Sequence, residues 1–142
     1  MNRRISTKKT VSQKKVLFVC THNSGRSQMA EAIFNRHAPS QIRAISAGSQ
    51  PADRLNQTVV NAMKEIDIDI SRQRPKLLTA EMLDEAAMVI VMGCGENNAC
   101  PAALVPTIDW ELDDPEGQPI RKVRQIRDEI DARVKQLIEK EV

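Results

Sequence analysis

A cysteine and an arginine lie six positions apart near the start of the chain, and this pair of residue types can act together on an anion. A cysteine thiolate is a nucleophile, and an arginine guanidinium can bind two oxygens of one oxyanion. The residues between them are small or polar, which allows several backbone N–H groups to converge on a tetrahedral anion. The segment is Cys20-Thr21-His22-Asn23-Ser24-Gly25-Arg26-Ser27. We interpret it as an oxyanion-binding loop in which Cys20 is the nucleophile and Arg26 binds the anion.

Three residues of this loop carry more detailed expectations. We expect the Ser27 hydroxyl to hydrogen-bond the Cys20 sulfur, the Asn23 amide to bridge loop carbonyls, and Gly25 to supply unusual backbone angles. The alternative is a small buried cysteine that happens to precede a surface arginine. A nucleotide-binding P-loop is excluded, because the chain lacks the pattern G-x-x-x-x-G-K-[ST].

A candidate proton donor lies near the other end of the chain. Attack on an oxyanion requires protonation of the departing oxygen, usually by a carboxylic acid. Asp114 precedes Pro115, which restricts the backbone before it to extended conformations. An Asp-Pro pair that only forms a turn is the alternative. Together with the cysteine loop, the pair favours Asp114 as a general acid.

The two other cysteines, Cys94 and Cys100, stand close together in a segment rich in glycine and asparagine. A zinc site needs four nitrogen or sulfur ligands, and this pair lacks the usual spacing of two to four residues. Inert buried thiols are a second alternative, although a polar loop is a poor place to bury them. With three cysteines the chain cannot pair all of them internally, so we expect a reducing, cytoplasmic location.

These residues must be positioned by alternating strands and helices. The apolar pattern predicts strands at Val16–Cys20, Ile42–Ser46, Met88–Met92 and Thr107–Trp110. It predicts helices at Ser27–Ala38 and Asn56–Glu65, a short helix that Thr79 caps and that ends near Glu85, and a last helix that Pro119 opens. Such alternation indicates one α/β domain with a parallel sheet covered on both faces, and ligands bind beyond the carboxyl ends of its strands. Cys20, Cys94 and Asp114 each follow a predicted strand, so we expect them to converge there.

Composition and charge limit the classes of molecule that this protein is expected to bind. Residues 1–14 form a basic leader that we expect to be disordered, and residues 15–142 form a single domain. Residues 1–15 hold six basic side chains and no acid, so removing these six charges from the net charge of +2 leaves the rest of the chain at −4. This balance argues against a nucleic-acid-binding domain. No apolar stretch is long enough for a membrane span of about 18 residues.

Several separated motifs, in order along the chain, resemble a known family. They are Cys20-Thr21-His22-Asn23-Ser24-Gly25-Arg26-Ser27, Ser27-Gln28-Met29-Ala30-Glu31-Ala32, Ser46-Ala47-Gly48, Ala62-Met63-Lys64-Glu65-Ile66-Asp67-Ile68-Asp69-Ile70-Ser71 and Trp110-Glu111-Leu112-Asp113-Asp114-Pro115. The first and last resemble the low-molecular-weight protein tyrosine phosphatases, and the set resembles the thioredoxin-coupled arsenate reductases within that superfamily. The resemblance implies a single three-layer α/β domain, with a four-stranded parallel sheet and helices on both faces.

The resemblance also implies a use for all three cysteines. Cys20 would attack arsenate, Cys94 would then attack Cys20 and release arsenite, and Cys100 would move the disulfide to a Cys94–Cys100 pair that thioredoxin reduces. The implied partners are therefore arsenate and thioredoxin, with no bound cofactor, and we expect a cytoplasmic monomer that binds neither nucleic acid nor membrane. Five residues separate the last two cysteines, slightly fewer than in the best-known members.

Some members of this family carry a monovalent-cation site beneath the loop. Asn23, Glu31 and Ser46 match its ligands, but Lys76 stands where the family has an aspartate. The Lys76 ammonium could replace the cation, or it could be an ordinary solvated side chain.

Two other functions remain open. A tyrosine phosphatase usually carries aromatic residues after its Asp-Pro pair, whereas Glu116 and Gly117 follow here and the chain has no tyrosine; weak phosphatase activity is nevertheless expected. A non-enzymatic redox or oxyanion sensor would use the same cysteines and need no general acid. The reductant could also be glutaredoxin or a small thiol in place of thioredoxin.

Overall fold

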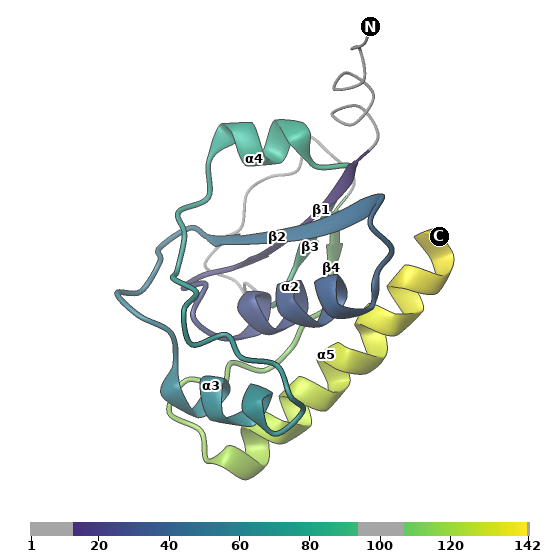
Figure 1. Ribbon diagram of the computed structural model, residues 1–142. Helices are drawn as coiled ribbons and strands as arrows, with labels where there is room; N and C mark the ends of the chain where they lie inside the picture. The colour runs from purple at the N-terminus through teal and green to yellow at the C-terminus, as the bar shows by residue number, and fades with distance from the viewer. Residues whose placement is uncertain (1–12, 94–106, 142) are drawn as a thin grey trace, which may run out of the picture.

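The computed structural model describes residues 13–93 and 107–141, and its centre is a sheet of four parallel strands (Figure 1). The strands are β1 (Lys14–Cys20), β2 (Ile42–Gly48), β3 (Met88–Val91) and β4 (Thr107–Asp109), in the spatial order β2-β1-β3-β4. All three pairings are parallel, as the alternation of elements predicts. The predicted four-stranded parallel sheet is therefore confirmed.

The register of the sheet brings the ends of distant segments together. Cys20 at the end of β1 pairs with Gly48 of β2, and Val19 pairs with Val91 of β3. Val91 pairs in turn with Asp109 at the end of β4. The residues that follow these strands consequently emerge at one edge of the sheet, where ligands bind in folds of this kind.

Helices cover both faces of the sheet, which confirms the three-layer arrangement (Figure 1). One face packs against α2 (Arg26–His37), α3 (Gln57–Lys64) and α5 (Ile120–Glu141). The other face is smaller, and its apolar residues Leu17, Val19 and Val89 lie under the short helix α4 (Ala80–Glu85). Successive side chains of β1 alternate between the two clusters, because the side chains of a strand point to opposite faces in turn.

Local sequence signals explain where several helices begin. The Asn56 side chain accepts hydrogen bonds from the N–H groups of Thr58 and Val59 and so caps α3. The Thr79 hydroxyl accepts from the N–H of Met82 at the start of α4, as predicted. Pro119 immediately precedes α5, where its missing N–H costs nothing. Observed and predicted boundaries agree within two residues, the usual uncertainty of an element end.

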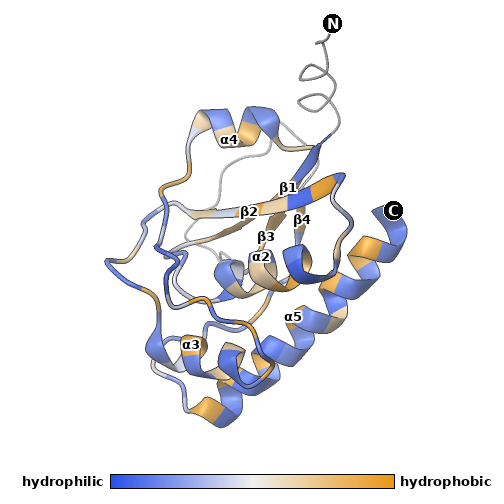
Figure 2. Ribbon diagram, viewed as in Figure 1, coloured by the Kyte–Doolittle hydropathy of each residue, from blue (hydrophilic) through white to orange (hydrophobic). Residues whose placement is uncertain are grey.

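The last helix has one apolar face along its whole length (Figure 2). Its buried apolar residues recur every three or four positions, as the sequence predicts. They are Val123, Ile126, Ile130, Val134 and Leu137. Arg127 is also buried on this helix, and its burial was not predicted.

Two predicted segments fall outside the described residues. These are the basic leader, apart from residues 13 and 14, and the segment that contains Cys94 and Cys100. Within residues 13–93 and 107–141, no helix is both long enough and apolar enough to cross a membrane.

Candidate functional site

The predicted nucleophile lies where the central strand meets a helix. Cys20 is the last residue of β1, and Arg26 is the first residue of α2. Cys20 is buried, with 3% of its surface exposed, and its sulfur has two hydrogen-bonding neighbours. Sγ lies 2.9 Å from the Ser27 hydroxyl and accepts a bond of 3.3 Å from the backbone N–H of Asn23. The predicted contact between Ser27 and Cys20 is therefore confirmed, and both neighbours can stabilise a thiolate.

The backbone of the loop is arranged to receive an anion. The carbonyls of Thr21, His22 and Ser24 accept hydrogen bonds of 2.8–3.0 Å from N–H groups within residues 50–56. Among the described residues, no acceptor bonds the backbone N–H groups of Ser24, Gly25 and Arg26. These N–H groups lie at the start of α2, where unpaired donors and the helix dipole favour negative charge. The loop can therefore bind a tetrahedral oxyanion through its backbone.

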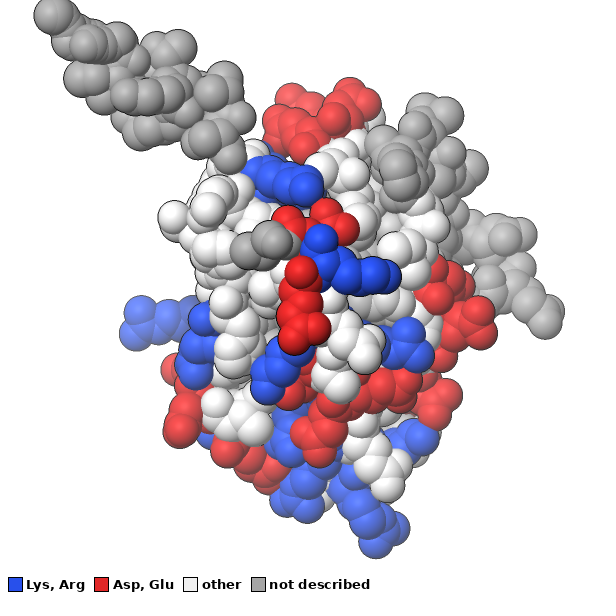
Figure 3. All heavy atoms as spheres, turned by 90° about the vertical axis from the view of Figure 1, so that its right-hand side faces the viewer, with Lys and Arg blue, Asp and Glu red and all other residues white. Residues whose placement is uncertain are grey.

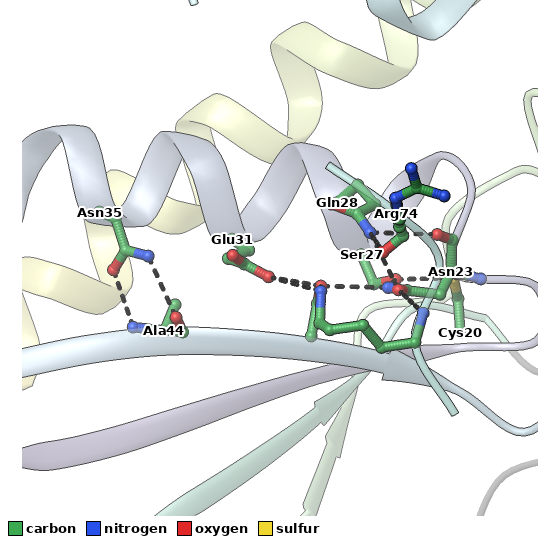
Figure 4. Close-up of polar contacts among 10 residues, drawn as sticks. Cys20, Asn23, Ser27, Gln28, Glu31, Asn35, Ala44 and Arg74 are labelled. Atoms are coloured by element: carbon green, nitrogen blue, oxygen red, sulfur yellow. Dashed lines mark hydrogen bonds and ion pairs between the residues drawn. The ribbon is translucent and has the colours of Figure 1, made fainter. Parts of the chain in front are cut away.

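The Asn23 side chain lies beneath the loop and holds it together (Figure 4). Its Nδ2 donates to the hydroxyls of Ser27 (2.7 Å) and Ser46 (3.1 Å). Its Oδ1 accepts from Gln28 Nε2 (2.9 Å) and from the backbone N–H of Lys76 (2.8 Å). The prediction that Asn23 bridges loop carbonyls is thus wrong. Its Nδ2 donates to two serine hydroxyls, and its Oδ1 accepts from the backbone N–H of Lys76, so the amide makes these contacts in place of contacts with loop carbonyls. Asn23 also takes the left-handed backbone conformation, with φ of 51°, which asparagine tolerates better than most residues.

Gly25 has two reasons to be a glycine. Its backbone angles, φ −143° and ψ −89°, lie outside the helical, extended and left-handed regions, as predicted. A Cβ at this position would also lie 2.8 Å from Cγ of Pro115, so a glycine lets the Asp114–Pro115 segment pack directly on the loop. Gly48 does the same from β2, because a Cβ there would lie 2.5 Å from the carbonyl oxygen of Thr21.

Arg26 joins the loop to the ends of two other strands. It is buried, and its Nη1 donates to the carbonyls of Met92 (2.6 Å), Gly93 (3.1 Å) and Leu112 (3.0 Å). Nη2 lies 3.9 Å from Asp114 Oδ2. Within the described residues no hydrogen bond uses Nε, so the Nε–Nη2 edge is available to bind two anion oxygens.

The two adjacent aspartates differ in their partners. The hydrogen bond of 2.7 Å from Lys122 Nζ, with the charges of Lys122 and Arg26, holds the pKa of Asp113 below its usual value. Asp114 has no lysine partner among the described residues, and its Oδ1 accepts from the N–H of Glu116. Asp113 is therefore held as a carboxylate, and Asp114 is the better placed proton donor.

A small pocket brings the predicted residues together. Its walls are formed by Cys20, His22, Ser24, Gly25, Arg26, Asn56, Asp114, Pro115 and Glu116. The convergence of Cys20 and Asp114 agrees with the sequence prediction, and Arg26 lies beside them. Cys94, the third residue expected there, lies outside the described residues, and Asn56 and Glu116 were missed. The sequence predicted Asn56 only as the first residue of a helix, and it marked Glu116 only as a residue that stands where tyrosine phosphatases usually carry an aromatic side chain.

The residues that match a cation site also lie together, with Lys76 among them. Ser46 Oγ donates to Glu31 Oε1 (2.5 Å), and Lys76 Nζ lies 3.5 Å from the same oxygen. Among the described residues, no group of three or more His, Cys, Asp or Glu side chains could hold a metal ion.

Comparisons with known proteins place this site in a family. A family model described as low molecular weight phosphotyrosine protein phosphatase matches residues 15–142. Arsenate reductase 1 of Bacillus cereus is 39% identical over 131 residues, which cover 90% of this chain and 96% of the relative.

Solved structures of similar fold include both arsenate reductases and a phosphatase. A thioredoxin-dependent arsenate reductase of Corynebacterium glutamicum matches with a TM-score of 0.78 and 37% identity, over 95% of this chain and 65% of that one. The YwlE arginine phosphatase of Geobacillus stearothermophilus matches with a TM-score of 0.80 and 30% identity, over 89% of this chain and 92% of that one. The chain therefore belongs to the low molecular weight phosphotyrosine protein phosphatase family and, within that family, groups with the arsenate reductases.

Proposed function

We propose that this protein reduces arsenate to arsenite by a relay of its three cysteines, with thioredoxin as the reductant. The observation that carries the proposal is the contact between Arg26 and Gly93, whose carbonyl accepts a bond of 3.1 Å from Nη1. Gly93 directly precedes Cys94 in the chain. Arg26 thus ties the start of the two-cysteine segment to the loop that holds Cys20.

The first step uses the pocket around Cys20. The Cys20 thiolate attacks the arsenic atom, the N–H groups of the loop and Arg26 bind the arsenate oxygens, and Asp114 donates a proton to the departing oxygen, which leaves as water. An As–S bond replaces an As–O bond, and arsenic remains pentavalent. Ser27 and the N–H of Asn23 favour the thiolate that this step requires.

The later steps exchange thiolates for disulfides. The Cys94 thiolate attacks the Cys20 sulfur, the S–As bond breaks, and its electron pair stays on arsenic, which leaves as arsenite. The Cys100 thiolate then attacks Cys94, so that Cys20 is regenerated and a Cys94–Cys100 disulfide forms. Two electrons from thioredoxin reduce this disulfide and complete the cycle. Both relatives named as arsenate reductases support this assignment, one of them as thioredoxin-dependent.

Phosphate-ester hydrolysis is the second candidate, because the fold match to an arginine phosphatase is as strong as those to arsenate reductases. The same loop would bind a phosphate group. The chain has only three aromatic residues, Phe18, Phe34 and Trp110, and all three are buried in the core. No aromatic side chain is therefore left to flank the ring of a phosphotyrosine, which argues against that substrate.

The test is NADPH consumption in the presence of arsenate, thioredoxin and thioredoxin reductase. Wild type is expected to turn over, and Cys20→Ser, Cys94→Ser and Cys100→Ser are each expected to reduce the rate to background. Hydrolysis of p-nitrophenyl phosphate by the same proteins is the matched control. It needs only Cys20, so any weak activity should survive in Cys94→Ser and Cys100→Ser and show that the loop is intact.

The reductant is tested by replacing thioredoxin with glutaredoxin and glutathione in the same assay. Turnover with thioredoxin alone supports the proposal. Arsenate-dependent turnover that persists without Cys94 or Cys100 would overturn the relay, and phosphatase activity without arsenate reduction would favour the second candidate.

A further inference from the structure

We infer that the ammonium of Lys76 takes the place of the monovalent cation that the resemblance implies, and that Lys76 and Glu31 are positioning residues for the Cys20 thiolate. The residues do not fit a bound cation, because Lys76 Nζ already lies 3.4 Å from Ser46 Oγ and 3.5 Å from Glu31 Oε1. The inference rests on the proposed function only for the role of Cys20 as nucleophile.

Glu31 determines which atom is the donor in the two hydrogen bonds that link it, through Ser46, to Asn23. A carboxylate only accepts, so the bond of 2.5 Å between Ser46 and Glu31 uses the proton of the Ser46 hydroxyl. The Ser46 oxygen is then free to accept from Asn23 Nδ2 at 3.1 Å. Glu31 thereby fixes Ser46 as an acceptor toward the loop.

The orientation of the Asn23 amide is fixed from the other side. The backbone N–H of Lys76 can only donate, so the atom that it meets at 2.8 Å must be Oδ1. Nδ2 therefore faces the hydroxyls of Ser46 and Ser27. Since Ser27 accepts from Nδ2 at 2.7 Å, its own proton is free to point at Cys20 Sγ, 2.9 Å away. The last hydroxyl of this chain of hydrogen bonds, that of Ser27, therefore donates to the Cys20 sulfur, and a donor at this place favours the thiolate.

The Lys76 side chain carries a positive charge next to Glu31, and this charge has a role separate from the hydrogen bond that the Lys76 backbone makes. The Glu31 side chain is only 19% exposed, and its negative charge lies on the same side of α2 as the Cys20 thiolate. Two anions in one partly buried region repel each other unless a cation lies between or beside them. The Lys76 ammonium offsets Glu31, so that the hydrogen-bond chain can hold a carboxylate without disfavouring the thiolate. The other charged or titratable side chains at the pocket are His22, Arg26, Asp114 and Glu116.

The experiment measures Cys20 itself, without arsenate. In a Cys94→Ser/Cys100→Ser background, the rate of alkylation of Cys20 by iodoacetamide is followed from acidic to neutral pH, with either choline chloride or potassium chloride as the salt. With Lys76 in place, the rate should be the same in both salts. Lys76→Met should lower the rate about tenfold in choline, as expected for loss of one charge near a partly buried anion. Potassium should restore much of that loss, because it can take the place of the ammonium.

Two further variants keep the test decisive. Lys15→Met is the matched control, because Lys15 pairs with Glu85 far from the loop and its loss should leave alkylation unchanged. Adding Glu31→Gln to Lys76→Met should recover the rate, since the amide keeps an acceptor for Ser46 and removes the uncompensated charge. A variant that had merely lost its fold would not recover.

The inference is overturned if Lys76→Met alkylates as fast as Lys15→Met, or if the protein with Lys76 responds to potassium. It is also overturned if Glu31→Gln fails to rescue a folded Lys76→Met protein. Because alkylation needs no arsenate, the proposed function can fail while this inference holds, and the reverse is equally possible.

Discussion

Arg26 does two jobs, because its guanidinium carries five N–H donors in a rigid plane. One end is used inside the protein, where Nη1 satisfies the carbonyls of Met92, Gly93 and Leu112. The other edge faces the pocket and Asp114. A lysine could neutralise an anion here, but it could not satisfy three carbonyls and bind two oxygens at once. The contacts within the protein therefore favour an arginine at this position independently of the anion binding that we propose for it.

The neighbouring aspartates give a prediction at the same scale. Asp114→Asn should lower kcat for arsenate reduction by about 10²- to 10⁴-fold, the usual contribution of a general acid, with little change in KM. Asp113→Asn should change kcat by less than about threefold, since Lys122 holds the Asp113 carboxylate ionised and unsuitable as a donor at neutral pH. Steady-state assays of the two variants under identical conditions provide the comparison. Equal losses in both, or a normal rate in Asp114→Asn, would remove Asp114 from the mechanism.

Individual site residues were predictable where their contacts are local in sequence. Ser27 is seven residues from Cys20, and one strand-to-helix connection brings them together. The partners of Asn23 were not predictable from its own stretch of sequence, because Ser46 and Lys76 lie 23 and 53 residues away; only the resemblance to a cation site placed them near it. Residue type alone shows that Asn23 can donate and accept, but not to which groups.

At the scale of elements, α3 and α5 are joined by a cluster of charges. Glu65, which follows α3, accepts three hydrogen bonds of 2.8–3.2 Å from Arg124 and one of 2.8 Å from Arg127. Arg127 is buried and also donates to the carbonyl of Ala62 in α3. The hydrogen bonds from Arg124 and then Arg127 lower the pKa of Glu65 from 4.5 to about 2.

This shift predicts how stability depends on pH. Above pH 4.5, Glu65 is ionised in the folded and unfolded states, and its contribution is fully present. As the pH falls from 4.5 toward 2, Glu65 becomes protonated in the unfolded chain but stays ionised in the folded protein. The contribution of Glu65 to the free energy of unfolding is therefore progressively lost. Wild type should thus be more stable than Glu65→Gln at neutral pH, and the gap should narrow below pH 4.5.

Urea unfolding of both proteins over a pH series measures that gap. Glu129→Gln is the matched control, because within the described part of the chain Glu129 pairs only with the exposed Arg133 one turn along α5. Its effect should be small at every pH. A gap between wild type and Glu65→Gln that widens on acidification would contradict the assignment.

Most elements were predictable because each carries its own periodic pattern or cap. The apolar stripe of α5 and the caps of α3 and α4 are local signals, and the structure confirms them. The burial of Arg127 was not predicted, because a charged side chain was assigned to the polar face, although position 127 lies four residues after Val123 and three before Ile130 and so shares their face. Its burial depends on α3 packing across α5 and supplying an acceptor from Ala62.

For the molecule as a whole, charge is dispersed over the face that α5 dominates. Figure 3 shows acidic and basic side chains intermixed there, with no large area of one sign. Several of them form ion pairs along or beside the helix, among them Lys135 with Asp131 and Lys14 with Glu141. Such a face offers no continuous basic surface to a phosphate backbone. In the proposed function, anions are bound by the backbone N–H groups and Arg26 at the loop and not by this face.

The same helix ties the site to the rest of the core, because Cys20 and Ile130 belong to one cluster of buried residues. Ile130 is fully buried in the middle of α5, so Ile130→Ala should lower the free energy of unfolding by about 2–5 kcal/mol. Ile108 on the edge strand β4 is 44% exposed, and the identical truncation there should cost less than about 1 kcal/mol.

Urea titrations followed by circular dichroism give both values, and parallel slopes would show that the domain unfolds as one unit. Equal losses at the two positions would mean that α5 does not close the core, and a shallower slope for Ile130→Ala would mean that part of the fold had already opened.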